Sequence, residues 1–286
     1  MKVSGFTFIR NANKLSFPVV QSIRSVLPIC DEFIVNVGVS DDGTLELIEA
    51  MDEPKVRIVE TPWNEGMQVR GFVYGQQKTI GLFNCTGDWA FYLEGDEVVH
   101  EDELQNIHDS MSRQLNNPDV EALVFDYHHF WANHKTVLDS PAWYRKAPRV
   151  IRNTIRAWAP GGLYFLVLQT NKRGRYPRAA YANAHIYHYG WVRPQDVMNE
   201  KIKSVEKFWD KTNPDVKYTR VDPSILKEFT GTHPAVMKGW LPDEPAPFEP
   251  DPGYRLTMKD KKYRLKKKLE NILGLDLCKK HYKLVR

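Results

Sequence analysis

The chain has 286 residues, of which 42% are hydrophobic, so it can bury one large core or two smaller ones. No apolar run approaches the ~20 residues of a membrane-spanning helix, and the three cysteines form no close pair, which argues against a disulfide framework or a zinc ribbon. The net charge of +4 is uneven: residues 255–286 hold 12 Lys or Arg against 3 Asp or Glu, so the rest carries −5 and offers no broad basic face for nucleic acid.

Short apolar runs and helical patterns alternate through the first 115 residues. We predict strands at 3–9, 33–37, 56–59 and 89–93, and helices at 17–26, 44–51, 71–84 and 102–115. Continuous apolar strands joined by helices of this length are typical of a mainly parallel sheet covered on both faces, so an α/β fold is expected. The first strand pattern begins directly after Met1, without the apolar region and cleavage site of a signal peptide, and we expect a cytoplasmic protein.

The pattern changes after a further strand at 122–125. Aromatic, Arg, Pro and Gly residues dominate 128–190, with strands expected near Val150 and at 185–189, and a helix follows at 196–211. We divide the chain into four segments, 1–126, 127–212, 213–254 and 255–286. The third segment is rich in proline and is expected to wrap around the body in an extended form.

An acidic motif follows the strand at 89–93. Glu94, Asp96 and Glu97 come directly after its apolar residues, with Gly95 between the first two acids. Open α/β sheets bind ligands at the carboxyl ends of their strands, and two closely spaced carboxylates can share a divalent cation beside a phosphate. A cation such as Mn²⁺ or Mg²⁺ is therefore one interpretation, and solvated acids before a helix are the other.

Three stretches carry a resemblance to a known family. They are Phe6–Asn13, the turn from Val35 to Thr44, and the run from Gln77-Lys78-Thr79 through Gly87-Asp88-Trp89 to Glu97. These motifs resemble those of the GT-A glycosyltransferases, especially family 2 members of the bacterial lipopolysaccharide and cell-surface polysaccharide type. The resemblance implies a GT-A, Rossmann-like three-layer sandwich, here with a C-terminal helical extension.

The resemblance also implies a division of labour. Residues 1–126 would bind a nucleotide-sugar donor, and residues 127–212 would bind the acceptor and complete the metal site. The donor contacts that it implies are Arg10, Asn11, Asn36, Asp42, Gln77, Lys78 and Glu94. Asn36 and Glu94 stand where the family has aspartates. From the residues alone, an ordinary Asp-Gly turn is the favoured interpretation of Asp42, and Lys78 is equally a surface lysine.

The metal ligand implied by the resemblance is Asp96, for which a helix-capping role is the alternative. The late stretch from His185 to Arg193 resembles the histidine strand that completes the family's metal site. Residues i and i+3 of a strand face opposite sides, so either His188 or His185 can face the cleft, but not both. A hydrogen-bonded, half-buried histidine is the alternative for each.

The implied reaction is transfer of a sugar from the donor to a hydroxyl of a saccharide or lipid-linked acceptor, with a divalent cation and with inversion. Inversion requires a carboxylate base, for which Asp139 is the first candidate and Asp126 the second. The departures at Asn36 and Glu94 leave a second interpretation, a non-catalytic sugar- or nucleotide-binding protein with a degenerate site.

The basic pattern at 259–275 predicts an amphipathic helix. Leu265, Leu269, Ile272 and Leu273 form one stripe among lysines. Such a helix either lies on an anionic membrane surface, which would make the protein peripheral on the inner face of the membrane, or packs on the body with its lysines in water.

Overall fold

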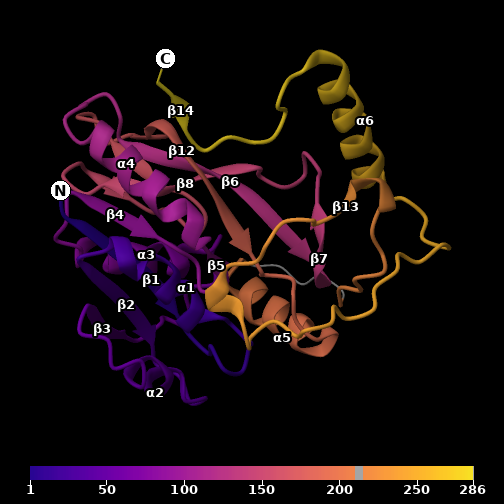
Figure 1. The fold of residues 1–286 in the computed structure, drawn as a ribbon, viewed down its shortest axis with the longest axis horizontal. Coiled ribbons are helices and arrows are strands. Elements are labelled where there is room, and N and C mark those ends of the chain that lie inside the picture. Colours follow the sequence, from indigo (N-terminus) through magenta and orange to yellow (C-terminus); the bar gives the residue numbers. More distant parts are fainter. Residues whose placement is uncertain (210–214, 286) are drawn as a thin grey trace.

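The computed structural model describes residues 1–209 and 215–285, which form a mixed α/β structure (Figure 1). The main sheet has the order β13–β7–β6–β8–β4–β1–β2–β3, and β12 joins it beside β6. Its strands are β1 (Val3–Ile9), β2 (Glu32–Gly38), β3 (Val56–Thr61), β4 (Trp89–Tyr92), β5 (Glu97–Val98), β6 (Ala122–Trp131), β7 (Asn133–Leu138), β8 (Lys146–Arg152), β12 (Arg178–His188), β13 (Leu226–Glu228) and β14 (Lys283–Leu284). The helices are α1 (Val19–Val26), α2 (Thr44–Glu49), α3 (Phe72–Phe83), α4 (Leu104–Gln114), α5 (Gln195–Glu206) and α6 (Met258–Leu273).

The predicted parallel sheet is confirmed around β1. This strand pairs in parallel with β2 on one side and β4 on the other, and β2 pairs in parallel with β3. Beyond β4 the pairing reverses, because β8 lies antiparallel between β4 and β6. A small separate sheet is formed by β9 (Ala157–Trp158), β10 (Leu166–Leu168) and β11 (Gly174–Arg175).

Helices cover both faces of the sheet, as the three-layer prediction requires. One core cluster joins Ile23 of α1, Ile48 of α2 and Met111 of α4 to inward-facing strand residues such as Phe91. Adjacent strand residues face opposite sides, so Tyr92 belongs instead to a second cluster with Leu82 of α3.

The acidic motif is held against the histidine strand by a short pairing. β5 is antiparallel to the end of β12, with Val98 opposite Tyr187 and Glu97 opposite His188. β12 in turn runs parallel to β6. These contacts bring residues 94–98 and 185–193 together, although they lie far apart in the chain.

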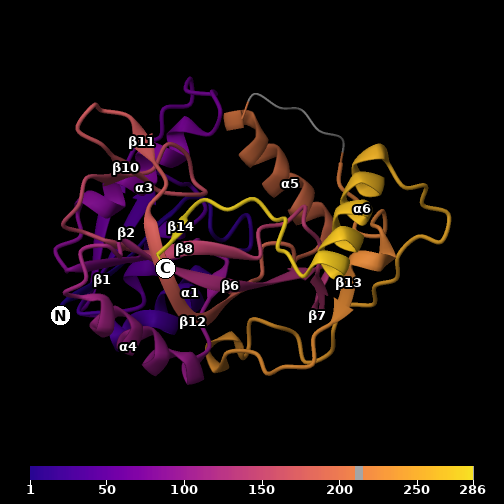
Figure 2. The same cartoon turned by 90° about the horizontal axis from the view of Figure 1, so that it is seen from above.

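The last third of the chain follows the predicted order with shifted ends. The helix predicted at 196–211 is α5, continued by a 3-10 turn at Lys207–Trp209, and positions 210–211 lie outside the described residues. The proline-rich segment contributes 3-10 turns at Pro223–Ile225 and Ala235–Met237 and the edge strand β13, which pairs with β7. After α6 the chain crosses back over the body, and β14 pairs with β12 (Figure 2).

Candidate active site

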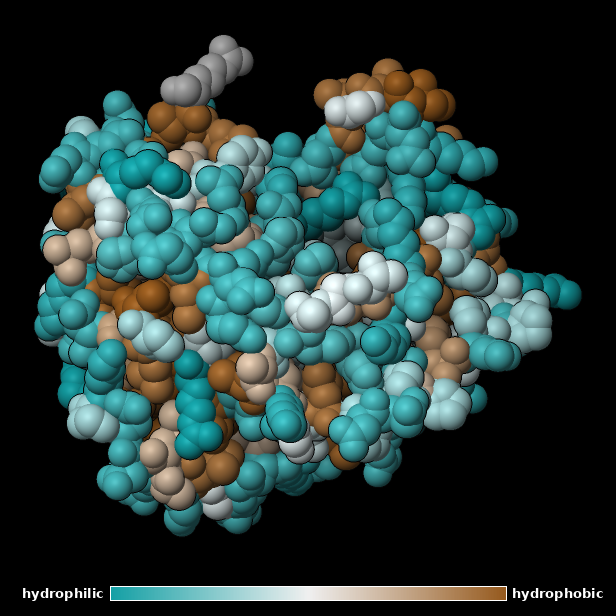
Figure 3. Space-filling model, in the orientation of Figure 1, coloured by the Kyte–Doolittle hydropathy of each residue, from teal (hydrophilic) through white to brown (hydrophobic). Residues whose placement is uncertain are grey.

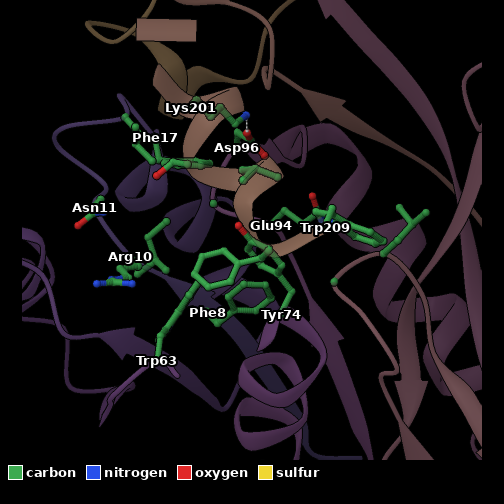
Figure 4. A pocket seen from close by; sticks show the side chains of 18 of the residues that line it. Phe8, Arg10, Asn11, Phe17, Trp63, Tyr74, Glu94, Asp96, Lys201 and Trp209 are labelled. Atoms are coloured by element: carbon green, nitrogen blue, oxygen red, sulfur yellow. Dashed lines mark hydrogen bonds and ion pairs between the residues drawn. The ribbon is translucent and has the colours of Figure 1, made fainter. Parts of the chain in front are cut away.

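A cavity of about 320 Å³ opens at the carboxyl ends of β1 and β4 (Figure 4). Because these strands are parallel, with Phe6 opposite Tyr92, the residues that follow them emerge at the same edge. We call this space the first cavity. Its polar residues include Arg10, Asn11, Glu94, Asp96, His188 and Lys201, and its apolar wall includes Phe8, Phe17, Trp63, Tyr74, Phe208 and Trp209.

Asp96 is surrounded by basic groups. It is 2% exposed, and its Oδ2 atom accepts a hydrogen bond from Lys201 Nζ at 2.7 Å and lies 3.4 Å from Arg193 Nη2. Burial alone would raise the pKa of Asp96, but the positive charges of Lys201 and Arg193 bring that pKa below its usual value. The carboxylate is therefore ionised at neutral pH.

A chain of hydrogen bonds orients His188. His129 Nε2 lies 2.7 Å from the carbonyl oxygen of Tyr144, which only accepts, and burial lowers the pKa of His129 well below its usual value. His129 is therefore neutral and carries its proton on Nε2, so its Nδ1 accepts from His188 Nδ1 at 2.9 Å. Burial also lowers the pKa of His188, which leaves its Nε2 unprotonated.

This unprotonated nitrogen points at a carboxylate. His188 Nε2 lies 3.7 Å from Asp96 Oδ1, so two electron-pair donors face each other without a hydrogen between them. A side chain on Gly190 would fill the space beside them, since a Cβ there would lie 2.4 Å from His188 Nε2. The arrangement suits a cation bound by both atoms.

Glu94 completes a candidate ligand set. One ligand atom from each of Glu94, Asp96 and His188 lies within 4.8 Å of the other two. Two carboxylates and an imidazole are a donor set that Mn²⁺ or Mg²⁺ accepts, and the hydrogen bond from His188 to His129 is the outer contact that fixes a ligating histidine. The residues therefore fit a divalent cation.

A buried ion pair fixes the position of the acidic motif. The side chains of Arg149 and Glu97 are both 0% exposed, and Arg149 donates to the two oxygens of Glu97 at 2.7 and 2.5 Å. Arg149 also donates to Glu94 at 3.1 Å. Burial, then the nearby Glu97, raises the pKa of Glu94 to about 7.

Five of the predicted site residues line the first cavity, namely Arg10, Asn11, Glu94, Asp96 and His188. Arg10 forms an ion pair with Glu65 and lies over the ring of Trp63. Of the two histidine alternatives, His188 is the one that faces Asp96. His185 lies on the opposite side of β12, where its Nδ1 is 2.6 Å from Glu103.

Four predicted donor contacts do not line the first cavity. Asn36 is fully buried and its side chain donates a hydrogen bond to the side chain of Gln77 at 2.9 Å, so the two residues are hydrogen-bonded to each other inside the protein. Asp42 accepts from the backbone of Lys14 at 2.9 Å and holds a turn. Lys78 is neither at the surface nor in the cavity: it is buried, donates to the carbonyl of Gly162 at 3.0 Å and lies 3.8 Å from the centre of the Tyr92 ring.

The two predicted bases lie around a second cavity of about 520 Å³. Side chains alternate along β6 and β12, so Asp126, with His128 and His185, faces away from the His129–His188 pair. Asp139 contacts Arg145, Lys227 and Lys267. Sequence patterns do not indicate this separation, because it depends on which strands pair.

Sequence patterns also missed residues of the first cavity. Lys201 is the main example: it follows the buried Met198 by three positions on α5 and therefore faces the body. A lysine at that spacing is a signal for a buried ion pair. Trp63, Tyr74 and Phe208 carry no such signal, since they reach the cavity from three separate segments.

Comparisons with known proteins gave partial matches, and no family model matches the sequence. The succinoglycan biosynthesis protein ExoO of Rhizobium meliloti (strain 1021) is 28% identical over 109 residues, which are 37% of this chain and 29% of that protein. Among solved structures, TarS of S. aureus is 13% identical with a TM-score of 0.41, covering 72% of this chain and 39% of TarS. Glucosyl-3-phosphoglycerate synthase from Mycobacterium tuberculosis, in complex with Mn²⁺, UDP and phosphoglyceric acid, is 17% identical with a TM-score of 0.31, covering 46% of this chain and 43% of the synthase.

Each match thus spans less than half of the relative's own length. The sequence match is to a protein of polysaccharide biosynthesis, the class of protein that the motifs resemble.

Proposed function

We propose that this protein transfers a sugar from a nucleotide-sugar donor to an acceptor hydroxyl. The observation that carries the proposal is the composition of the first cavity, where Asp96 and an unprotonated His188 nitrogen share one edge with Arg10 and an aromatic wall. Sugars stack their C–H faces on aromatic rings, and a diphosphate needs positive partners. Trp63, Tyr74 and Arg10 offer both kinds of contact within one cavity.

In the proposed reaction, the bond between the anomeric carbon and the diphosphate oxygen breaks as the acceptor oxygen attacks from the opposite face. Asp96 and His188, with Glu94, would hold a divalent cation, which when bound would stabilise the charge on the leaving diphosphate. Arg10 lies at the same cavity and would bind a phosphate oxygen. The aromatic wall would exclude water, so that the acceptor rather than water attacks.

The acceptor proton must pass to a carboxylate base. Asp139 and Asp126 are the predicted candidates for this role and lie around the second cavity. Among the described residues that line the first cavity, the carboxylates are Glu94 and Asp96, and both are assigned to the cation. A base at Asp139 would require the acceptor hydroxyl to approach through the second cavity.

A donor screen tests the proposal. The purified chain would be assayed against a panel of nucleotide-sugars with Mn²⁺ and saccharide acceptors, beside the variants Asp96→Asn and Asp102→Asn. Asp102 is an exposed acid six residues further on and serves as the matched control. We expect Asp96→Asn to lose at least about 100-fold in turnover and the control to keep it. Binding of nucleoside diphosphate without turnover of any donor would instead favour the non-catalytic interpretation.

We also propose that α6 attaches the protein to an anionic membrane surface. The helix is well defined by its sequence, with a capping box between Thr257 and Asp260 and a left-handed Gly274 at its end. It contacts the body through charged side chains, since Arg264 pairs with Asp222 and Glu270 with Arg145. Its apolar residues point the other way.

The exposed apolar face of α6 consists of Met258, Leu265, Leu269, Ile272 and Leu273. It forms a brown cluster at the upper right of the space-filling view, where Figure 1 draws α6 (Figure 3). Lysines flank this stripe along the helix, at positions 259, 261, 262, 266 and 268. An outward apolar stripe with flanking lysines is the pattern of a helix that lies in an anionic interface. No helix of the described residues is long and apolar enough to cross a membrane.

Vesicle flotation tests this attachment. The full chain would be compared with the variant Leu265→Ser/Ile272→Ser on vesicles with and without anionic lipid. Phe83→Ser is the control, because Phe83 is 71% exposed but lies on α3. We expect the chain and the control to float with anionic vesicles only, and the double variant to stay behind. Equal flotation of all three proteins would contradict the role of α6. If α6 binds the membrane, a lipid-linked acceptor becomes the preferred substrate class.

A further inference from the structure

Lys201 makes two hydrogen bonds and one aromatic contact at the acidic motif. Its Nζ donates to Asp96 Oδ2 at 2.7 Å and to the carbonyl oxygen of Gly190 at 3.0 Å. The same nitrogen lies 4.9 Å from the centre of the Phe17 ring, a distance at which a cation is attracted to an aromatic face. The side chain is 14% exposed. The ammonium group is therefore fixed at Asp96 and borders the first cavity (Figure 4).

The two oxygens of Asp96 have different surroundings. Oδ2 faces both Lys201 and Arg193, and Arg193 is itself anchored to the carbonyl of Leu15 at 2.9 Å. Oδ1 lies 3.7 Å from Nε2 of His188. Oδ2 is thus paired with cations of the chain, and Oδ1 is the oxygen that would bind an added cation.

We infer that Lys201 acts as a built-in cation, which balances Asp96 when no divalent ion is bound and weakens the binding of that ion. The inference rests on the proposed function and deepens it. An ammonium on the same carboxylate repels a divalent ion and draws charge from the ligand oxygen. Because Lys201 also lines the first cavity, it offers a positive charge to a diphosphate whether or not a metal is present.

Titration of the full chain with Mn²⁺ alone, by calorimetry, tests the first consequence. Lys201→Gln is expected to bind Mn²⁺ at least about 10-fold more tightly than the unaltered chain, because the competing charge is gone. Lys203→Gln is the matched control: it removes the same charge from α5, but Lys203 is 67% exposed and pairs with Asp215. The control is expected to stay within about twofold.

The second consequence is measured with UDP in the presence of a chelator. Lys201→Gln is expected to bind UDP about 10-fold more weakly than the unaltered chain, whereas Lys203→Gln is expected to bind it normally. Arg193 still pairs with Asp96 after the substitution, so the carboxylate is not left alone in the interior. Lys201→Met has a similar length without hydrogen-bonding capacity and must show the same two shifts.

An unchanged or weaker Mn²⁺ affinity in both Lys201 variants would overturn the inference. The two proposals fail separately. If a donor is turned over while the Lys201 variants bind Mn²⁺ like the unaltered chain, only the role of Lys201 falls. If the Mn²⁺ shift is observed but no nucleotide-sugar is bound or turned over, the transferase proposal falls and Lys201 remains a regulator of cation binding.

Discussion

Arg149 and Glu97 illustrate how single residues prepare the site. Both side chains are fully buried, and Tyr127 adds a hydrogen bond to Glu97 at 2.8 Å. Burial would lower the pKa of Arg149, but the negative charge of Glu97 keeps that pKa well above its usual value. Two charges in a dry interior are costly unless each is fully paired, so either partner depends on the other.

Substitution of Arg149 by Met is therefore expected to destabilise the protein by about 3–5 kcal/mol, since Glu97 would remain as a buried, unpaired charge. Urea unfolding measures this change. The double variant Arg149→Met/Glu97→Leu is expected to recover most of the loss. Arg156→Met, at an exposed position, serves as the control and should stay within about 0.5 kcal/mol. A loss below about 1 kcal/mol for Arg149→Met would contradict the account.

Asp139 offers a second test at this scale. Its contacts with Lys227 and Lys267 lower its pKa to about 2 against the opposing effect of burial, which makes it a weak proton acceptor near neutral pH. We expect Asp139→Asn to keep turnover within about threefold of the unaltered chain, with stability reduced instead. A loss of about 100-fold in a folded variant would restore Asp139 as the base and would move the acceptor to the second cavity.

At the scale of elements, close packing against a neighbouring segment explains why α3 contains a glycine, a residue of low helix propensity. Gly75 is the fourth residue of this helix, and a Cβ there would be 2.6 Å from the carbonyl oxygen of Ala159 and 2.8 Å from the backbone nitrogen of Gly161. The adjacent Gly162 holds Lys78 and lines the first cavity. The glycine thus permits α3 to approach a segment that forms one side of the site.

Gly75→Ala is expected to destabilise the protein by about 1–3 kcal/mol, because the clash is with backbone and cannot be relieved by a rotamer change. In a free helix the same substitution would add about 1 kcal/mol of stability, so the sign of the change is informative. Thermal unfolding gives the answer. Gln76→Ala, one position on and exposed, should be neutral or slightly stabilising. A more stable Gly75→Ala variant would show that the contact is loose.

At the scale of the whole molecule, several histidines are buried or half-buried in neutral form. The pKa values of His128, His233 and His281 are all lowered to about 4, in each case mainly by burial. An unfolded histidine takes up its proton near pH 6.5, so between pH 6.5 and 4 the unfolded chain binds more protons than the folded one. The contribution of these histidines to the free energy of unfolding is therefore present above pH 6.5 and is lost as the pH falls toward 4.

His281 allows this prediction to be tested at one position, because its ring stacks on Tyr164 at 4.5 Å and phenylalanine keeps that contact. The free energy of unfolding of His281→Phe should fall less steeply between pH 6.5 and 4 than that of the unaltered chain, by at most about 3 kcal/mol over the interval. His108→Gln, whose side chain is 46% exposed, should leave the slope unchanged. Parallel pH profiles for all three proteins would contradict the shift at His281.

Local patterns along the chain were sufficient to predict β1 to β4, the helices α1 to α6 and the acidic edge. Alternating apolar strands and helices predicted a mainly parallel sheet, which β1 forms with β2 and β4, and the residues after β1 and β4, Arg10 and Asp96, do line one cavity. These features follow from local periodicity and from the rule that parallel strands end at the same edge.

Only the tertiary structure decides which other residues join Arg10 and Asp96 at the first cavity. His188 rather than His185 faces Asp96 because β12 pairs with β5. Of the predicted bases, Asp126 faces another cavity because side chains alternate along β6, and Asp139 reaches that cavity from the end of β7. Lys201 reaches the motif from a helix about a hundred residues away. Contacts of this kind depend on strand order and side-chain direction between distant segments, which local patterns do not encode.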